Sequence, residues 1–158
     1  MLYPLLLGPD FEKLPQALRD FHGAPSGERA SGAATVKHDN PWLARIVGFP
    51  PAGEDIPVRL EVVAEEDSEE WRREFGGTTL DSIQRRDGNL LLETFGVLRL
   101  FFRVFPVEHG LRLELQRARL GIIPLPLRIE ASERGCESGW EFEVNVAGIG
   151  SYRGKMGA

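Results

Sequence analysis

Five residues on three predicted strands combine charge, hydroxyl and aromatic character in a spacing that suits a binding site. Trp71, Arg73 and Phe75 share one face of the first strand, because side chains alternate across a β-strand. Ser82 and Glu93 lie on the next two strands. If Arg73 and Glu93 point into the same interior, they can pair and orient a ligand through charge-assisted hydrogen bonds. The alternative is that both face solvent, as most charged side chains do.

Glu93 is a better candidate for a buried carboxylate than most of the acidic residues. Its face of the strand also carries Leu91 and Phe95. A carboxylate that is buried without a partner favours its protonated form, which is how a general acid arises. An enzymatic role for Glu93, together with Arg73 or Tyr152, therefore stays open beside a binding role.

A second candidate site is the predicted strand 97–105, which has two apolar faces. It places Leu98, Leu100, Phe102 and Val104 on one face and Val97, Arg99, Phe101, Arg103 and Phe105 on the other. A half-solvated strand should not carry three large hydrophobic side chains on its outer face. One explanation is that this second face lines a cavity for a ligand with an apolar body and an anionic group. Another is that a helix covers this face. In a third alternative, arginine stems lie over apolar surface with their charged ends in water.

Other kinds of catalytic or metal site find no support in the sequence. His22, His38 and His109 are not spaced from one another, or from Cys136, as metal ligands usually are. No serine lies in a Gly-x-Ser-x-Gly motif, and the segment 148–150 lacks the third glycine of a dinucleotide-binding loop. We therefore expect no metal, no cofactor and no recognisable catalytic motif.

Length and composition indicate one globular domain over residues 1–158. The chain is 42% hydrophobic and 27% charged, which is ordinary for such a domain. Its net charge of −5 argues against a nucleic-acid binder and gives no reason to expect attraction to anionic lipid headgroups. The single cysteine excludes an intrachain disulfide, and no apolar stretch approaches the roughly 20 residues of a transmembrane helix. We expect a cytoplasmic protein.

Helices are expected only in the first third of the chain. An apolar stripe at helical spacing, which predicts a helix over residues 10–22, consists of Phe11, Leu14, Leu18 and Phe21. Asp10 is the expected N-cap, and Pro15 fits best as an early helical residue after a separate first turn. Asn40-Pro41 predicts the start of a short helix through Trp42–Val47.

From Val58 onward the hydrophobic period changes to two, which predicts about nine or ten strands. Gly76-Gly77 and Asp87-Gly88 are typical hairpin turns. Short turns imply antiparallel neighbours, and a meander of this length usually rolls up so that its edges are paired. The sequence therefore predicts a mainly β fold, an antiparallel β-barrel or half-barrel with an N-terminal helix and one short helix.

Several short pieces spread over nearly the whole chain are shared with a known family. They are Leu6-Leu7-Gly8, Leu14-Pro15, His22-Gly23, Trp71-Arg72-Arg73, Phe95-Gly96, Leu120-Gly121, Pro124-Leu125-Pro126 and Gly150-Ser151-Tyr152-Arg153-Gly154. In these the chain resembles a bacterial family of unknown activity, domain of unknown function 4166. Similar proteins carry the domain behind a saccharopine-dehydrogenase-like oxidoreductase, which implies an oxidoreductase partner domain.

The resemblance bears on the candidate site as well as on the fold. It implies that five candidate residues fall in family-like positions, namely Trp71, Arg73, Ser82, Glu93 and Tyr152. The segment 147–149 departs from the family, where a proline-containing stretch would precede the glycine, so the conformation of the last turn is open.

Three hypotheses about function follow. The first, which we favour over an enzyme, is a non-catalytic module that binds a small, largely apolar ligand, with or without an anionic end, inside a barrel. Its candidate binding residues are Trp71, Arg73, Phe75, Ser82, Glu93, Arg99, Phe101, Arg103 and Tyr152. The second is an enzyme, or an accessory domain of an oxidoreductase, that uses Glu93. The third is a protein-interaction domain with an apolar outer face.

Overall fold

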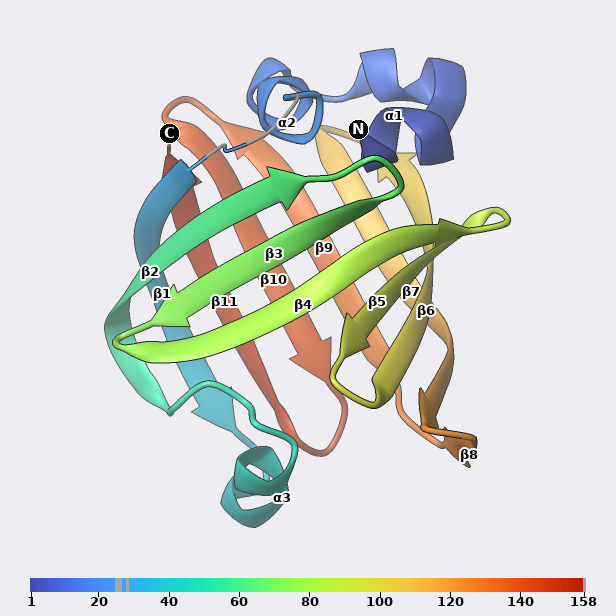
Figure 1. Cartoon of the computed structure of the whole chain (residues 1–158). Helices are drawn as coiled ribbons and strands as arrows, with labels where there is room; N and C mark the ends of the chain where they lie inside the picture. The colour runs from blue at the N-terminus through green and yellow to red at the C-terminus, as the bar shows by residue number, and fades with distance from the viewer. Residues whose placement is uncertain (25–26, 28, 158) are drawn as a thin grey trace.

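Ten antiparallel strands close into a barrel, and an eleventh short strand extends its edge (Figure 1). The computed structural model describes residues 1–24, 27 and 29–157. The strands are β1 (Arg29–His38), β2 (Gly53–Ala64), β3 (Ser68–Phe75), β4 (Thr78–Asp87), β5 (Leu90–Phe95), β6 (Leu98–Val107), β7 (Gly110–Leu120), β8 (Ile123–Leu125), β9 (Ile129–Cys136), β10 (Gly139–Val146) and β11 (Gly150–Gly157). Closure comes from β6, which pairs with both β5 and β7, while β8 pairs only with β7.

The predicted antiparallel barrel is confirmed, and so are the turns on which it was based. Gly76 (φ 55°) and Gly77 (φ 91°) form the β3–β4 hairpin in the left-handed region, which suits glycine because it has no Cβ. The expected count of nine or ten strands omitted β8. The three residues of β8 lie in a proline-containing segment that shows no alternation.

Three short helices cover one end of the barrel: α1 (Leu2–Leu7), the 3-10 helix η1 (Gly8–Lys13) and α2 (Gln16–His22). The helix expected over 10–22 is divided at Pro15, where a separate first turn was expected: η1 ends at Lys13, and Leu14 is extended (ψ 150°), as residues before proline prefer. Asp10 caps no helix. The predicted apolar stripe is nevertheless buried, with Leu18 fully so. Burial therefore follows the hydrophobic pattern even where the helix is broken.

The fourth helix, α3 (Pro41–Ile46), lies at the opposite end of the barrel (Figure 1). The side chain of Asn40 accepts a hydrogen bond from the Leu43 backbone N–H at 3.1 Å, which is the predicted N-cap. Phe49, just after the helix, packs against Tyr152 of β11, with 5.5 Å between the two ring centroids. The α3 segment thereby contacts the barrel interior.

The barrel wall is not uniform around its circumference. Residues Thr78–Ser82 of β4 have no partner on β5, because the β4–β5 ladder begins at Ile83. On β1 and β11 two small residues lie opposite each other, Ala34 and Gly154. The wall is therefore incompletely paired beside β4.

Gly154 provides a test of this packing, because a side chain there has no room. An ideal Cβ at this position would lie 2.2 Å from the carbonyl oxygen of Ala33 and 2.8 Å from the Phe142 ring. We expect Gly154→Ala to lower the free energy of unfolding by about 1–3 kcal/mol, as overpacking does. Chemical denaturation measures this. The exposed neighbour Lys155→Ala serves as control, and equal stability of the two variants would contradict the tight approach of β1 and β11.

Candidate functional site

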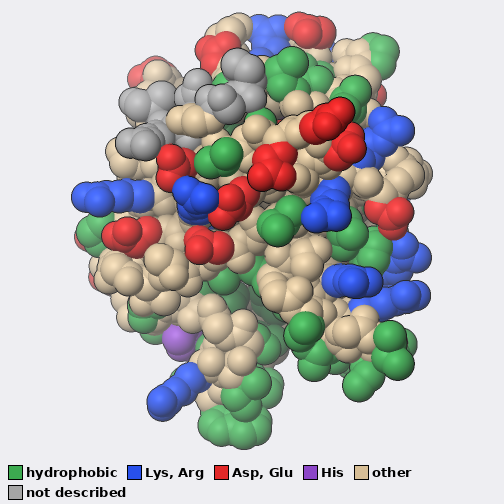
Figure 2. All heavy atoms as spheres, viewed as in Figure 1, with side chains coloured by type: hydrophobic (Ala, Val, Ile, Leu, Met, Phe, Trp, Pro, Cys, Tyr) green, Lys and Arg blue, Asp and Glu red, His purple; other side chains and the backbone are tan. Residues whose placement is uncertain are grey.

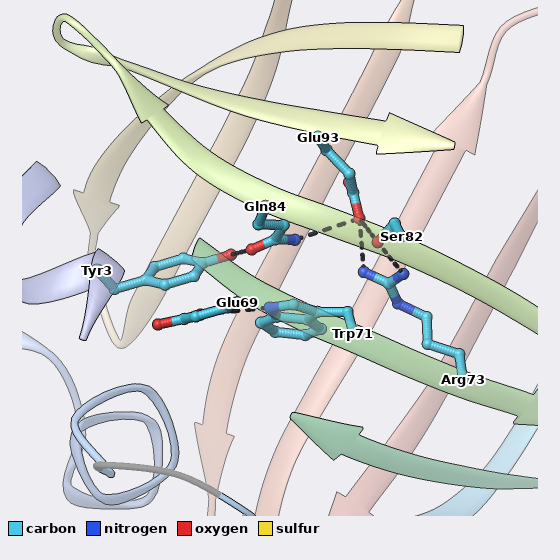
Figure 3. Close-up of polar contacts among 7 residues, drawn as sticks. All are labelled: Tyr3, Glu69, Trp71, Arg73, Ser82, Gln84 and Glu93. Atoms are coloured by element: carbon cyan, nitrogen blue, oxygen red, sulfur yellow. Dashed lines mark hydrogen bonds and ion pairs between the residues drawn. The ribbon is translucent and has the colours of Figure 1, made fainter. Parts of the chain in front are cut away.

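Arg73, Ser82, Gln84 and Glu93 form a hydrogen-bonded cluster inside the barrel (Figure 3). Arg73 Nη2 donates to Glu93 Oε1 at 2.7 Å, and Arg73 Nη1 donates to Ser82 Oγ at 2.9 Å. Ser82 Oγ and Gln84 Nε2 donate to the same Glu93 oxygen at 2.6 Å and 3.2 Å. The strand register brings these side chains together, since Gln84 lies opposite Glu93 and Ser82 opposite Trp71.

The second carboxylate oxygen of Glu93 is the unusual atom of the cluster. All three hydrogen bonds end on Oε1, and no described residue donates to Oε2. The side chains of Arg73 and Glu93 are 15% and 10% exposed. The hydrogen-bonding capacity of one interior carboxylate oxygen is therefore left unused by the described side chains.

Tyr152 of β11 adds a neutral hydroxyl to this interior. Burial raises the pKa of Tyr152 to about 12; Arg73 opposes this rise and Glu93 adds to it. Within the described part of the chain the Tyr152 hydroxyl makes no hydrogen bond, and its oxygen is not among the fully buried polar atoms that lack a partner. The ring is fixed by Phe75 and Phe142, at 5.2 Å and 6.1 Å between centroids. A protonated hydroxyl is thus held in place with its donor and acceptor capacity free.

Arg73 stays a cation despite its burial. Burial alone would lower the pKa of Arg73, but the charge of Glu93 and the hydrogen bond to it raise this pKa above its ordinary value. Its guanidinium also lies over the rings of Trp71 and Phe95, at 5.0 Å and 6.0 Å from their centroids. Its charge is therefore balanced by one carboxylate and two aromatic faces.

Apolar side chains surround the cluster on the side away from the helices. Trp71 and Phe75 are buried in the core, whereas other inward-facing side chains are only half-buried although they lie inside a closed sheet. These half-buried residues are Leu80, Phe95, Leu98, Phe142, Val144 and Tyr152. The β4 residues Thr78–Ser82 have no partner on β5 beside this interior surface.

The helical cap is joined to the cluster by buried polar contacts. The Leu2 backbone N–H donates to Glu69 Oε1 at 2.8 Å, and Trp71 Nε1 donates to Glu69 Oε2 at 3.3 Å. Tyr3 Oη donates to Gln84 Oε1 at 3.4 Å. Burial raises the pKa of Tyr3 well above its ordinary value, and nearby carboxylates, Glu69 among them, raise it further. The first helix is thus linked through Gln84 to Glu93.

The structure does not bring Arg99, Phe101 and Arg103 to this cluster. Arg99 and Arg103 are exposed on the outer face of β6, opposite in direction to the inward Leu100. Phe101 is buried on that outer face, where the Arg117 guanidinium lies 4.0 Å from its ring centroid. Arg103 also lies over an aromatic ring, with its guanidinium 5.8 Å from the centroid of Phe105.

Three residues of the network were missed from the sequence: Tyr3, Glu69 and Gln84. Gln84 could have been found, because it lies two positions after Ser82 and so shares its face. The parts played by Tyr3 and Glu69 depend on how the helical cap folds back onto the barrel, which no local sequence pattern shows.

The Nε2 atom of His22 in α2 lies 2.6 Å from a carboxylate oxygen of Glu133. Among the described residues, no group of three or more His, Cys, Asp or Glu side chains could hold a metal ion.

The family described as Domain of unknown function (DUF4166) matches residues 14–150 of this chain. No curated protein matches this chain. A solved structure of a secretory abundant heat soluble (SAHS) protein from Ramazzottius varieornatus is similar at 9% sequence identity and a TM-score of 0.44. The similarity covers 82% of this chain and 93% of that one. In the described part of the chain no helix is long and apolar enough to span a membrane.

Alkaline titration tests the environment of the two tyrosines, which are the only ones in the chain. A raised folded-state pKa means that the neutral phenol stabilises the fold fully below the unfolded pKa, about 10. For Tyr152 this contribution is lost as the pH rises through about 12. We expect almost no tyrosinate absorbance from the folded protein near pH 10, whereas about half of the tyrosine should be ionised at that pH in denaturant.

The variant Tyr152→Phe is the control for the second half of this test. Between the unfolded pKa and about 12, the stability of the wild type should fall more steeply with pH than that of Y152F. If a tyrosine of the folded protein titrates at the same pH as in the denatured protein, its hydroxyl is in contact with solvent, which would contradict its burial.

Proposed function

The chain belongs to the DUF4166 family, and we propose that it binds a small, largely apolar molecule inside the barrel, with a polar group held by Arg73, Glu93 and Tyr152. The observation that carries this proposal is the unpaired oxygen Glu93 Oε2 in apolar surroundings. A buried polar atom normally has a partner, so an unpaired one marks the position of a ligand donor.

The charge balance favours a neutral polar group over an anionic one. Arg73 is already paired with Glu93, so a carboxylate would bring a second negative charge next to Glu93. A hydroxyl avoids this repulsion because it can donate to Glu93 Oε2 and accept from Tyr152. An alcohol-type head on an apolar body therefore fits the site better than a fatty-acid head.

An enzymatic use of the same site rests on the same free oxygen. Glu93 Oε2 can accept a proton from a bound hydroxyl, and Tyr152 could stabilise the charge that develops. We rank this second, because Glu93 and Arg73 are held by each other and by Ser82. Turnover of a bound alcohol would favour catalysis over simple binding.

A matched pair of ligands tests the proposed function. We expect 1-decanol to bind to the protein, and decanoate of the same chain length to bind at least tenfold more weakly, because its charge repels Glu93. Isothermal titration calorimetry gives both dissociation constants. Glu93→Gln removes the repulsion and should narrow the difference between the two ligands.

Two further variants separate the interior from the outer face. Tyr152→Phe should weaken decanol binding by roughly 5- to 10-fold, the usual effect of one lost hydrogen bond. Arg103→Ala, on the outer face, should leave binding unchanged. Absence of binding by both ligands, or a loss in Arg103→Ala equal to that in Tyr152→Phe, would contradict an interior site.

A further inference from the structure

The end of the barrel opposite the helical cap carries exposed apolar side chains on two separate projections. One is α3, where Trp42 is 70% exposed, and the other is the β7–β8 turn, where Ile122 is 93% exposed. Ile46 of α3 and Val97 of the β5–β6 turn are also exposed. Figure 1 places α3 and β8 at this same end, and Figure 2 shows hydrophobic side chains gathered there.

The charges at this end differ from those of the whole chain. Four segments meet here through the strand register: 41–49, 95–101, 117–129 and 144–150. Together they contain five arginines and no Asp or Glu, although the chain as a whole has a net charge of −5. The nearest acidic residues along the chain lie just outside these segments, at Asp39, Glu93, Glu130 and Glu143. In Figure 2 the acidic side chains on the visible face lie nearer the other end.

Two of these arginines lie directly opposite each other with no acid between them. Arg99 of β6 is the register partner of Arg119 of β7, and both are exposed. Within the described part of the chain neither forms an ion pair, whereas the nearby Arg117 pairs with Asp87 at 3.1 Å. Like charges placed opposite each other across two strands are destabilising, so a bound anion would stabilise this pair.

We propose that this end docks on the surface of a bilayer that contains anionic phospholipids. Trp42 and the exposed aliphatic side chains of both projections enter the interfacial region, and Arg99 and Arg119 bind phosphate oxygens. Two apolar projections flanked by arginines match a layered surface that is anionic outside and apolar beneath. A second copy of this chain is a poorer partner, because two arginine-rich ends would repel each other.

Docking in this orientation does not depend on the ligand site, but it would bring that site close to a source of apolar ligands. The β5–β6 turn with Val97 follows directly on the end of β5, where the β4–β5 ladder is interrupted. The docked end therefore brings this incompletely paired part of the wall close to the lipids. An apolar ligand could pass between bilayer and interior there, a step that rests on the proposed function.

Vesicle flotation with the full chain tests the docking. We expect the protein to float with vesicles of phosphatidylcholine mixed with phosphatidylglycerol, and to float much less with phosphatidylcholine alone. Salt should weaken the binding, because exposed charges are screened. Trp42 reports insertion through quenching by brominated lipid, since the other two tryptophans, Trp71 and Trp140, are buried.

Paired variants assign the surface. R99E/R119E and I122S/I123S should each reduce the partition coefficient at least tenfold. The controls make the same changes elsewhere on exposed positions, R85E/R86E on β4 and L5S on α1, and should bind as the wild type does.

Three results would overturn the proposal. One is no flotation with anionic vesicles, and another is equal binding to neutral and anionic vesicles. The third is self-association that I122S/I123S abolishes in the absence of lipid, which would assign the surface to a second copy. Decanol binding by R99E/R119E is measured in parallel, so failure of docking and failure of the ligand site are distinguishable.

Discussion

The ion pair between Arg73 and Glu93 is the constraint that organises the interior of this barrel. Each side chain is buried, and each would be a costly unpaired charge without the other. Ser82 and Gln84 complete the coordination of one carboxylate oxygen and leave the second unpaired. Replacing a buried ion pair by apolar side chains is often neutral or stabilising, so stability alone does not account for its presence. We propose that the pair is retained because its unpaired oxygen holds a ligand.

The same cluster connects parts of the chain that are distant in sequence. The first helix reaches it through hydrogen bonds of Tyr3 and Gln84. The segment after α3 contacts Tyr152 through Phe49, and Tyr152 interacts with Arg73 and Glu93 electrostatically, without a hydrogen bond. The two ends of the barrel thus meet at one polar centre. The cap end is sealed by aromatic packing, such as Phe21 against Trp140 at 4.6 Å, whereas the opposite end exposes apolar and basic side chains.

Alternation along strands predicted much of this from the sequence. It placed Trp71, Arg73 and Phe75 on one face and put Glu93 among hydrophobic neighbours, because a period of two is a direct consequence of strand geometry. It could not say which of the two faces of strand 97–105 points inward. Barrel closure turns Leu100 in and Arg99 out. The net charge of −5 is an average over the whole chain and gives no information about where the arginines lie. The five arginines at one end come from separate segments that only the strand register brings together.

A double-mutant cycle on the ion pair tests the central claim most directly. Arg73→Met and Glu93→Gln each break the pair, and we expect the Met substitution alone, which leaves a buried charge, to cost about 3–5 kcal/mol of unfolding free energy. In the double variant the amide of Gln can still accept from Ser82 and Gln84. We expect its stability to return to within about 1 kcal/mol of the wild type, while decanol binding is lost. Additive losses of stability with binding intact would contradict a pair retained for ligand binding.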